Sequence, residues 1–277
     1  MSTYKQLLQT GLELLKQQKI ADANVDAWYL LAHVFDMNRT DLLLKGDRSV
    51  DEEAGQRYLE LIHQRAAHIP LQHILGTQEF MGLEFEVNRD VLIPRQDTEI
   101  LVEEVLKYCE DKSVLDMCTG SGCIIVSLAK LGRLMHAVGV DLSERALAVA
   151  ARNADKHMVK VTLLQSNLFD HVKGSFDIIV SNPPYIPSGD IEDLMPEVRD
   201  FEPRMALDGS DDGLIFYRCI SQAAKEHLNP EGLIFFEIGY NQGEAVKLIL
   251  TEEGFTDVVI KKDLSGLDRI VMARRYN

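Results

Sequence analysis

The residues of this chain best suited to chemistry form the run Ser-Asn-Pro-Pro-Tyr, which ends at Tyr185. The side chain of Asn182 and the backbone carbonyl of Pro183 offer two acceptors, because a proline nitrogen cannot donate while its carbonyl still accepts. Two neighbouring acceptors suit the hydrogens of an NH2 group. Pro184 further stiffens the loop, and Tyr185 can pack on a flat substrate. The run therefore predicts a receptor for an amino group on a planar molecule.

A second candidate site is the glycine-containing run Thr119-Gly120-Ser121-Gly122, which follows an apolar strand pattern and precedes an apolar helix pattern. Glycines at such a turn let the backbone and the helix N-terminus approach a ligand. Asp141 ends the next apolar run, 21 positions after Gly120, which is about the spacing at which a carboxylate binds ribose hydroxyls. The third glycine that favours NAD is replaced by Ile125. A nucleoside-bearing cofactor other than NAD is therefore expected.

Each pattern also has a purely structural interpretation. Glycines at a strand-to-helix turn occur for packing alone, and Asp141 followed by Ser143 is an ordinary helix start. Asn-Pro and Pro-Pro are common turn formers, and Pro-Pro-Tyr is also typical of segments that dock on a partner. The joint spacing of the glycine turn and Asp141, together with the amino-group receptor, favours the catalytic interpretation.

Composition limits the classes of partner. The 277 residues include 29 Lys and Arg against 44 Asp and Glu, a formal net charge of −15. A broad nucleic-acid surface is not expected, because such binding depends on cations that displace counterions from phosphates, although a local basic groove stays open. With 46% hydrophobic residues and only short apolar runs, the chain is expected to fold as a soluble protein without a membrane segment.

Cysteine spacing and the N-terminal residues indicate the compartment. The four cysteines form no C-x-x-C pair, and no histidine lies near them at zinc spacing. This predicts reduced thiols and no metal site. The first 15 residues lack the uninterrupted apolar stretch of a signal peptide, so a cytoplasmic location is expected.

Residues 1–75 are expected to form a small helical domain. Leucines at helical spacing predict a first helix, and an apolar set after Asn24, the expected N-cap, predicts a second. Ser49 and Glu52 predict a capping box that opens a further helix, which Pro70 ends.

Residues 76–95 are expected to form a hairpin connector, because apolar residues alternate there around Gly82. Asp97 is the expected cap of the first helix in residues 96–277, the predicted catalytic domain. Beyond it, short apolar runs alternate with helical patterns, which is typical of an α/β domain with a parallel sheet. We expect seven strands, at residues 113–117, 136–141, 159–165, 176–182, 232–237, 256–261 and 269–273. The stretch between residues 183 and 212 is a long loop with five prolines, and such loops are usually functional.

These motifs resemble those of class I S-adenosylmethionine (SAM) methyltransferases that modify planar amino groups. Within that class the chain is similar to the HemK/PrmC family, the glutamine methyltransferases of peptide chain release factors. The similarity covers nearly the whole chain and rests on residues 70–76, Phe80, Gly82, 92–95, 116–122, Asp141, 182–185 and 201–203. Two positions depart from the family pattern. Cys118 stands where the family's loop often starts with Gly, and Asn167 stands where an acidic residue is common near the adenine.

The resemblance implies a Rossmann-like class I methyltransferase domain with a seven-stranded sheet and a small N-terminal helical domain. It implies that SAM lies across the glycine turn, with Asp141 on the ribose and Asn182 at the edge of the cofactor site. The residues assigned to SAM are Cys118, Thr119, Gly120, Ser121, Gly122, Asp141, Asn167, Leu168 and Asn182. Asn167 and Leu168 are placed near the adenine.

The implied acceptor is the side-chain amide of the glutamine in the Gly-Gly-Gln motif of class I release factors. Asn182 and Pro183 would accept the two amide hydrogens and orient the nitrogen lone pair for in-line attack, while Pro184 and Tyr185 complete the substrate pocket. The helical domain would offer a second contact surface to the protein substrate. No metal and no direct contact with nucleic acid or membrane is expected.

Two alternatives stay open from the sequence. An adenine N6 methyltransferase would use the same receptor, because an exocyclic amine also presents an NH2 group on a flat ring. Its DNA-acting forms must extrude a base and hold the strand through phosphates, which the acidic composition disfavours. The other alternative is a non-catalytic SAM-binding or docking protein, which methyl transfer to any substrate would exclude.

Overall fold

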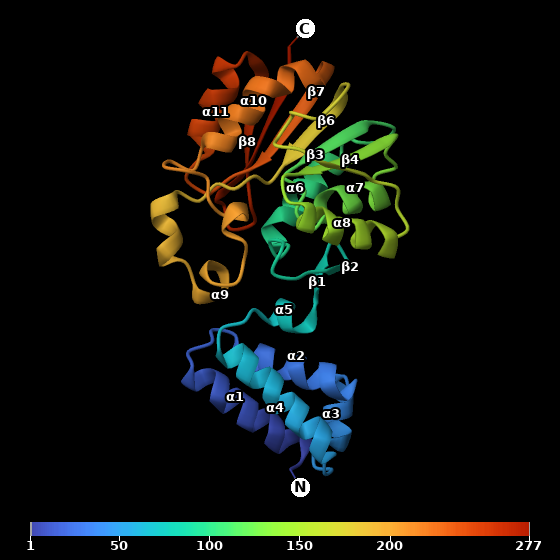
Figure 1. Ribbon diagram of the computed structural model, residues 1–277, viewed down its shortest axis with the longest axis vertical. Helices are drawn as coiled ribbons and strands as arrows, with labels where there is room; N and C mark the ends of the chain where they lie inside the picture. Colours follow the sequence, from blue (N-terminus) through green and yellow to red (C-terminus); the bar gives the residue numbers. More distant parts are fainter. Residues whose placement is uncertain (1, 277) are drawn as a thin grey trace. The chain divides into compact units, whose positions relative to one another are not determined.

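The computed structural model describes residues 2–276, which divide into two compact units (Figure 1). One unit contains the residues up to Gly76 together with Met195–Phe201, and the other contains Thr77–Leu194 and the residues from Glu202 onward. The first unit is therefore assembled from two stretches that are far apart in sequence. No described helix combines the length and apolar character that crossing a bilayer requires.

The first unit, here called the helical unit, packs its helices around one apolar core. Leu15, Leu31, Tyr58 and Ile62 have no exposed surface, and burial of an aliphatic side chain such as leucine or isoleucine contributes about 1.5 to 3 kcal/mol. The leucine spacing thus produces the expected helices. Its helices are α1 (Tyr4–Gln17), α2 (Ala23–Phe35), α3 (Arg39–Lys45), α4 (Glu52–Ala66), α5 (Leu71–Leu75) and the short α9 (Pro196–Arg199).

Two predicted helix starts in this unit are wrong. The N-cap of α2 is Asp22, so Asn24 lies inside the helix. The N-cap of α4 is Asp51, whose side chain accepts from the backbone N–H of Ala54 at 3.0 Å. Ser49 instead lies in an isolated bridge with the N-terminal segment. Neighbouring Ser, Asn and Asp residues have similar capping preferences, so long-range pairing decides among them.

The helix end predicted at Pro70 and the helix start predicted at Asp97 also differ from the structure. Helix α4 ends at Ala66, before Pro70, and Pro70 is the N-cap of α5. Helix α6 (Gln96–Leu106) follows Arg95, so Asp97 lies in its first turn rather than at its cap. A carboxylate still favours the helix there, because the N-terminal end of the helix dipole is positive.

The second unit, here called the sheet unit, is built on a seven-stranded sheet with the order β5-β4-β3-β6-β7-β9-β8. The seven strands are β3 (Ser113–Met117), β4 (His136–Asp141), β5 (Thr162–Gln165), β6 (Phe176–Ser181), β7 (Leu228–Glu237), β8 (Phe255–Lys262) and β9 (Asp268–Arg275). The expected strands are confirmed, but the purely parallel sheet is wrong, because β9 is antiparallel to both of its neighbours. Residues 263–267, which join β8 to β9, are too few for the crossover that parallel strands require.

Helices cover both faces of this sheet (Figure 1). Side chains of α6, α7 (Cys123–Leu131) and α8 (Glu144–Lys156) bury one face, whereas α10 (Ile215–His227) and α11 (Gly243–Glu252) bury the other. The predicted hairpin is confirmed as β1 (Thr77–Phe80) and β2 (Leu83–Glu86). Its buried Phe80 and Phe85 join the core on the α6 and α7 side.

The parallel strands bring several loops to one edge of the sheet. Met117 at the end of β3 is paired with Val140 on β4 and with Ser181 on β6. Strand order reverses between β3 and β6, and such a switch point is where ligands bind in open α/β sheets. The long loop after β6 contains the short helices η1 (Ser188–Asp193), α9 and η2 (Arg204–Ala206).

Candidate active site

A cavity of about 250 Å³ lies at this edge of the sheet unit. Its lining brings together nine of the predicted site residues, namely Cys118, Thr119, Gly120, Ser121, Asp141, Asn167, Leu168, Asn182 and Pro184. Further lining comes from residues 90–92, Pro94, Arg95, Thr98, Met205 and Phe216, which the sequence had not suggested as site residues. Within the described part of the chain, Gly122, Pro183 and Tyr185 are not among the lining residues.

Polar contacts with the neighbouring strands β3 and β4 hold the glycine turn in place. The Thr119 hydroxyl donates to the buried Asp116 carboxylate at 2.6 Å, and its backbone N–H donates to the Val140 carbonyl at 2.9 Å. Gly122, the N-cap of α7, has φ of 78°. A Cβ there would lie only 3.0 Å from the Ala150 Cβ. Gly122 therefore lets α7 pack closely against α8 and supports the cavity without lining it.

Cys118 occupies the left-handed region, with φ of 63°. An L-residue in this conformation costs about 1 to 2 kcal/mol, which explains in physical terms why glycine suits the position. The turn is nevertheless preserved with cysteine in this chain, and Cys118 packs partly against the core beside β3.

Asp141 connects the glycine turn to the end of β4. Its Oδ2 accepts from the Gly120 N–H at 2.9 Å, and its Oδ1 accepts from the Ser143 N–H at 2.8 Å. Burial raises the pKa of Asp141, against the effect of these hydrogen bonds. The carboxylate thus has a role in holding the turn in addition to the ribose contact predicted from its spacing.

Asn182 has its amide nitrogen directed into the protein. Its Nδ2 donates to the Thr98 hydroxyl oxygen at 3.3 Å, and its side chain lies beside Glu237, whose pKa it helps to lower. Because the NH2 group is directed at Thr98, the side-chain oxygen of Asn182 is left to accept from a ligand in the cavity. This orientation is the one that an amino-group receptor requires.

Glu237, at the carboxyl end of β7, is a functional candidate that the sequence reasoning missed. Its side chain is buried beside Thr98 and Asn182, and its Oε2 has no hydrogen-bond partner among residues 2–276. Burial raises the pKa of Glu237 to about 7, opposed by the Thr98 hydrogen bond and the charge of Arg269. The missed signal was an acidic residue at a strand end, the same signal that identified Asp141.

Arg95 and Glu202 join the segment before α6 to the long loop. Arg95 Nη2 lies 2.5 Å from Glu202 Oε1, and the Ile93 N–H donates to Glu202 Oε2 at 3.4 Å. Burial raises the pKa of Glu202, while the Arg95 charge lowers it. The pair places the loop residues that follow Glu202 along the cavity, where Pro203 and Met205 line it.

Tyr185 is held away from the cavity by the core. Its ring packs against the cluster that contains α10, and burial raises its pKa to about 12. Its carbonyl accepts from Gln242 Nε2 at 2.9 Å, which braces the loop after Asn182. A stacking contact between Tyr185 and a substrate stays a prediction.

Comparison with known proteins agrees with this architecture. Residues 6–76 match the family described as PrmC N-terminal domain, and residues 95–196 match the family described as methyltransferase small domain. The chain is 45% identical over 276 residues to a release factor glutamine methyltransferase of Geobacter sulfurreducens, covering 98% of this chain and 96% of that protein. It is 41% identical over 280 residues to one from Clostridium botulinum, covering 98% and 99%. A solved methyltransferase from Pyrococcus furiosus has a similar fold, with a TM-score of 0.57 at 17% identity over 77% of this chain and 99% of that one.

Proposed function

This chain belongs to the release factor glutamine methyltransferase family, and we propose that it methylates the side-chain amide nitrogen of the glutamine in the Gly-Gly-Gln motif of class I peptide chain release factors. It is a SAM-dependent enzyme. The observation that carries the proposal is the inward orientation of the Asn182 amide nitrogen, which leaves an acceptor oxygen for the substrate NH2 group.

The residues of the cavity fit SAM. The glycine turn offers a close backbone approach at Gly120, where φ is 55° and an added Cβ would meet nothing within 4 Å. We propose that Cys118 to Gly122 hold the cofactor, with Asp141 on the ribose and Asn167 and Leu168 beside the adenine. When bound, SAM supplies a methyl group activated by its positively charged sulfur.

The reaction needs a nitrogen lone pair that the free amide delocalises. We propose that the Asn182 side-chain oxygen and the Pro183 carbonyl accept the two amide hydrogens and so hold the nitrogen in the orientation for attack. These contacts strengthen as the nitrogen becomes positive, which stabilises the transition state more than the bound substrate. Pro184 lines the cavity beside them, and its ring limits the loop's freedom.

We propose that residues 1–75 form a domain that docks the protein substrate and that residues 96–277 form the domain that catalyses methyl transfer. Residues 76–95 form the hairpin connector between these two domains. The physical basis is that the glycine turn, Asp141 and Asn182 all belong to the sheet unit. We place the reaction in the cytoplasm, where peptide chain release takes place.

Incubation with labelled SAM and a class I release factor tests this function. We expect one methyl group per release factor, located by mass spectrometry on the glutamine of the Gly-Gly-Gln motif. Duplex DNA is the parallel substrate, and we expect no label in it. Methyl groups on adenine, or on other release factor residues, would contradict the proposal.

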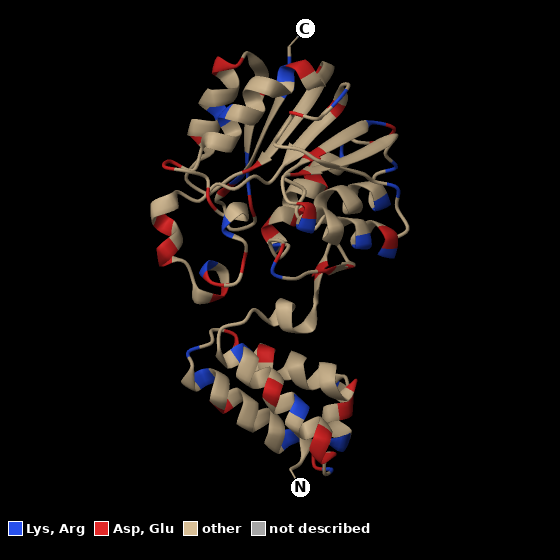
Figure 2. Ribbon diagram, viewed as in Figure 1, with Lys and Arg blue, Asp and Glu red and all other residues tan. Residues whose placement is uncertain are grey.

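Charge disfavours the nucleic-acid alternative. Figure 2 shows Lys and Arg scattered among the more numerous Asp and Glu rather than gathered along one element. Binding a nucleic acid backbone requires such a gathering, because affinity grows with the number of phosphates neutralised. The protein substrate is therefore favoured over DNA.

Changing Glu237 to Gln is expected to lower turnover by a few-fold to about tenfold, because it removes the carboxylate beside the Asn182 side chain and so weakens a polar interaction that orients Asn182, typically worth about 0.5 to 1.5 kcal/mol. The wild-type rate should fall as the pH drops through about 7, where Glu237 takes up a proton. Burial also raises the pKa of Asp116 to about 7, so either carboxyl group could cause the fall in rate. Comparing Glu237→Gln with wild type distinguishes the two groups. A pH-rate profile that keeps its full transition in Glu237→Gln would assign it to Asp116 instead.

Glu237→Gln should also change how the stability of the fold depends on pH. A folded pKa of about 7 means that the folded protein binds more protons than the unfolded chain between the ordinary carboxyl pKa and neutrality. Wild-type stability should therefore decrease as the pH rises through this window. Denaturant unfolding of Glu237→Gln at several pH values should show a weaker decrease.

A further inference from the structure

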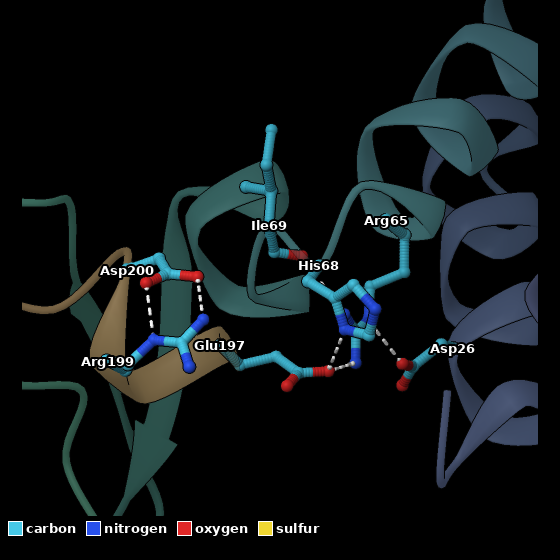
Figure 3. Close-up of polar contacts among 7 residues, drawn as sticks. All are labelled: Asp26, Arg65, His68, Ile69, Glu197, Arg199 and Asp200. Carbon is cyan, nitrogen blue, oxygen red and sulfur yellow. Dashed lines mark hydrogen bonds and ion pairs between the residues drawn. The ribbon is translucent and has the colours of Figure 1, made fainter. Parts of the chain in front are cut away.

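The middle of the long loop is attached to the helical unit by a partly buried polar cluster (Figure 3). Helix α9 supplies Glu197, and the end of α4 and the residues after it supply Arg65 and His68. Asp26 on α2 completes the cluster. All four residues belong to the helical unit, although Glu197 lies 129 positions beyond His68.

Arg65 is the centre of this cluster. Its side chain is only 8% exposed, and its three nitrogens each donate to a different group. Nε donates to Asp26 Oδ2 at 2.6 Å, Nη1 to the Ile69 carbonyl at 3.3 Å, and Nη2 to Glu197 Oε1 at 2.9 Å. A buried guanidinium tolerates no unpaired side, so the Arg65 fork selects a carboxylate in the position of Glu197.

Glu197 receives a second contact on the same oxygen. His68 Nδ1 lies 3.2 Å from Glu197 Oε1, and a carboxylate oxygen only accepts, so this nitrogen carries the proton in that contact. Burial opposes ionisation of Glu197, but the hydrogen bonds from its own backbone, Arg65 and His68 outweigh it and lower its pKa. Glu197 is thus held as a carboxylate.

Helix α9 depends on tertiary contacts for its position. The helix has four residues, and none of them, all of which the structure describes, is fully buried. A single helical turn is not stable by itself. The cluster around Arg65 therefore anchors α9 through Glu197.

The loop returns to the sheet unit directly after α9. Glu202 is buried there and pairs with Arg95 at 2.5 Å. Two carboxylates five positions apart are thus each fixed by an arginine, one in each unit. Pro203 and Met205, which line the cavity, follow at once.

We infer that Arg65 and Glu197 are positioning residues, which hold the middle of the long loop on the helical unit. They thereby act together with the Arg95–Glu202 pair to place the cavity-lining part of the loop for the protein acceptor. This inference rests on the proposed function. The glycine turn and Asp141 are fixed by contacts within the sheet unit, so the cluster should affect acceptor binding and leave cofactor binding unchanged.

Glu197→Ala tests the inference in the full-length protein. Asp26 still neutralises Arg65, so the fold should survive, which circular dichroism checks. We expect faster amide hydrogen exchange in residues 195–208, and a KM for the release factor raised about tenfold, equivalent to about 1.4 kcal/mol. The SAM affinity should stay within about twofold of wild type, well under the 1.4 kcal/mol that a tenfold change represents. Glu197→Gln keeps an acceptor for Arg65 and should recover part of both effects.

Asp200→Ala is the matched control. Asp200 lies just after α9, is half exposed and pairs with Arg199 at 2.7 Å on the surface (Figure 3). It should leave exchange and KM as in wild type, because exposed pairs contribute little. Wild-type exchange in Glu197→Ala, or a wild-type KM despite faster exchange, would overturn the inference. If wild-type enzyme leaves release factors unmethylated, the proposed function fails, and the exchange measurement still decides whether the cluster anchors the loop.

Discussion

Replacing Asn182 by alanine is expected to lower turnover by about a hundredfold to a thousandfold, equivalent to about 2.7 to 4 kcal/mol at the transition state. The reason is the proposed role of Asn182 as a fixed acceptor for the substrate amide, which its own NH2 group permits because it is directed at Thr98. An alanine leaves the substrate hydrogens unpaired and lets the nitrogen turn away from the line of attack.

Single-turnover methylation and calorimetric SAM titration together check this prediction. SAM affinity should change far less than turnover, because the glycine turn and Asp141 stay in place. Asn229→Ala is a matched control, since Asn229 donates to Asp177 at 2.9 Å from the start of β7, at the other end of that strand from Glu237. Near-normal turnover in Asn182→Ala would place the amino-group receptor elsewhere.

The sequence could predict that Asp141 and Asn182 lie close together, because the strands that precede them, β4 and β6, both run parallel to β3. Asp141 and Asn182 each follow an apolar strand, and parallel strands deliver their carboxyl ends to one edge. The same rule applied to the strand ending at Glu237 would have found that residue as well. What the rule cannot give is the direction in which the Asn182 amide points, because this depends on Thr98, 84 positions away.

Ion pairs between segments that are distant in the chain could not be predicted from the sequence. Arg95 and Glu202 stand 107 positions apart, and Arg65 and Glu197 stand 132 apart. No local spacing connects them, because an ion pair depends on how loops pack after the strands have assembled. Helix α9 shows the extreme case, since a segment of the long loop packs with the helical unit rather than with the strands on either side of it.

Local rules also failed where several neighbouring residues could each serve as the N-cap of a helix. Asn24 and Ser49 were predicted as caps, and Asp22 and Asp51 take those places. Each pair lies within two positions, and the free-energy difference between such caps is a fraction of a kcal/mol. Tertiary contacts of that size are common, so they decide the choice.

Replacing Asp141 by alanine is expected to weaken SAM binding about tenfold to more than a hundredfold, since a hydrogen bond to a charged group contributes about 1.5 to 3 kcal/mol. The proposed ribose contact supplies this effect, and the structure adds a second contribution. The carboxylate also holds the Gly120 and Ser143 amides, so its loss loosens the turn that we propose to bind the cofactor.

Stability should change less than SAM affinity in Asp141→Ala. Burial raises the pKa of Asp141, which means that the fold disfavours its ionised form at neutral pH, and removing the charge offsets part of the lost hydrogen bonding. Asp177→Ala is the matched control, because Asp177 accepts from the Ser113 N–H and hydroxyl at 2.8 Å each, at the opposite end of β6 from Asn182. It should lower thermal stability and leave the calorimetric SAM affinity unchanged. If Asp141→Ala binds SAM as wild type does, the carboxylate serves only the backbone of the turn, and the ribose must be held by another residue of the cavity.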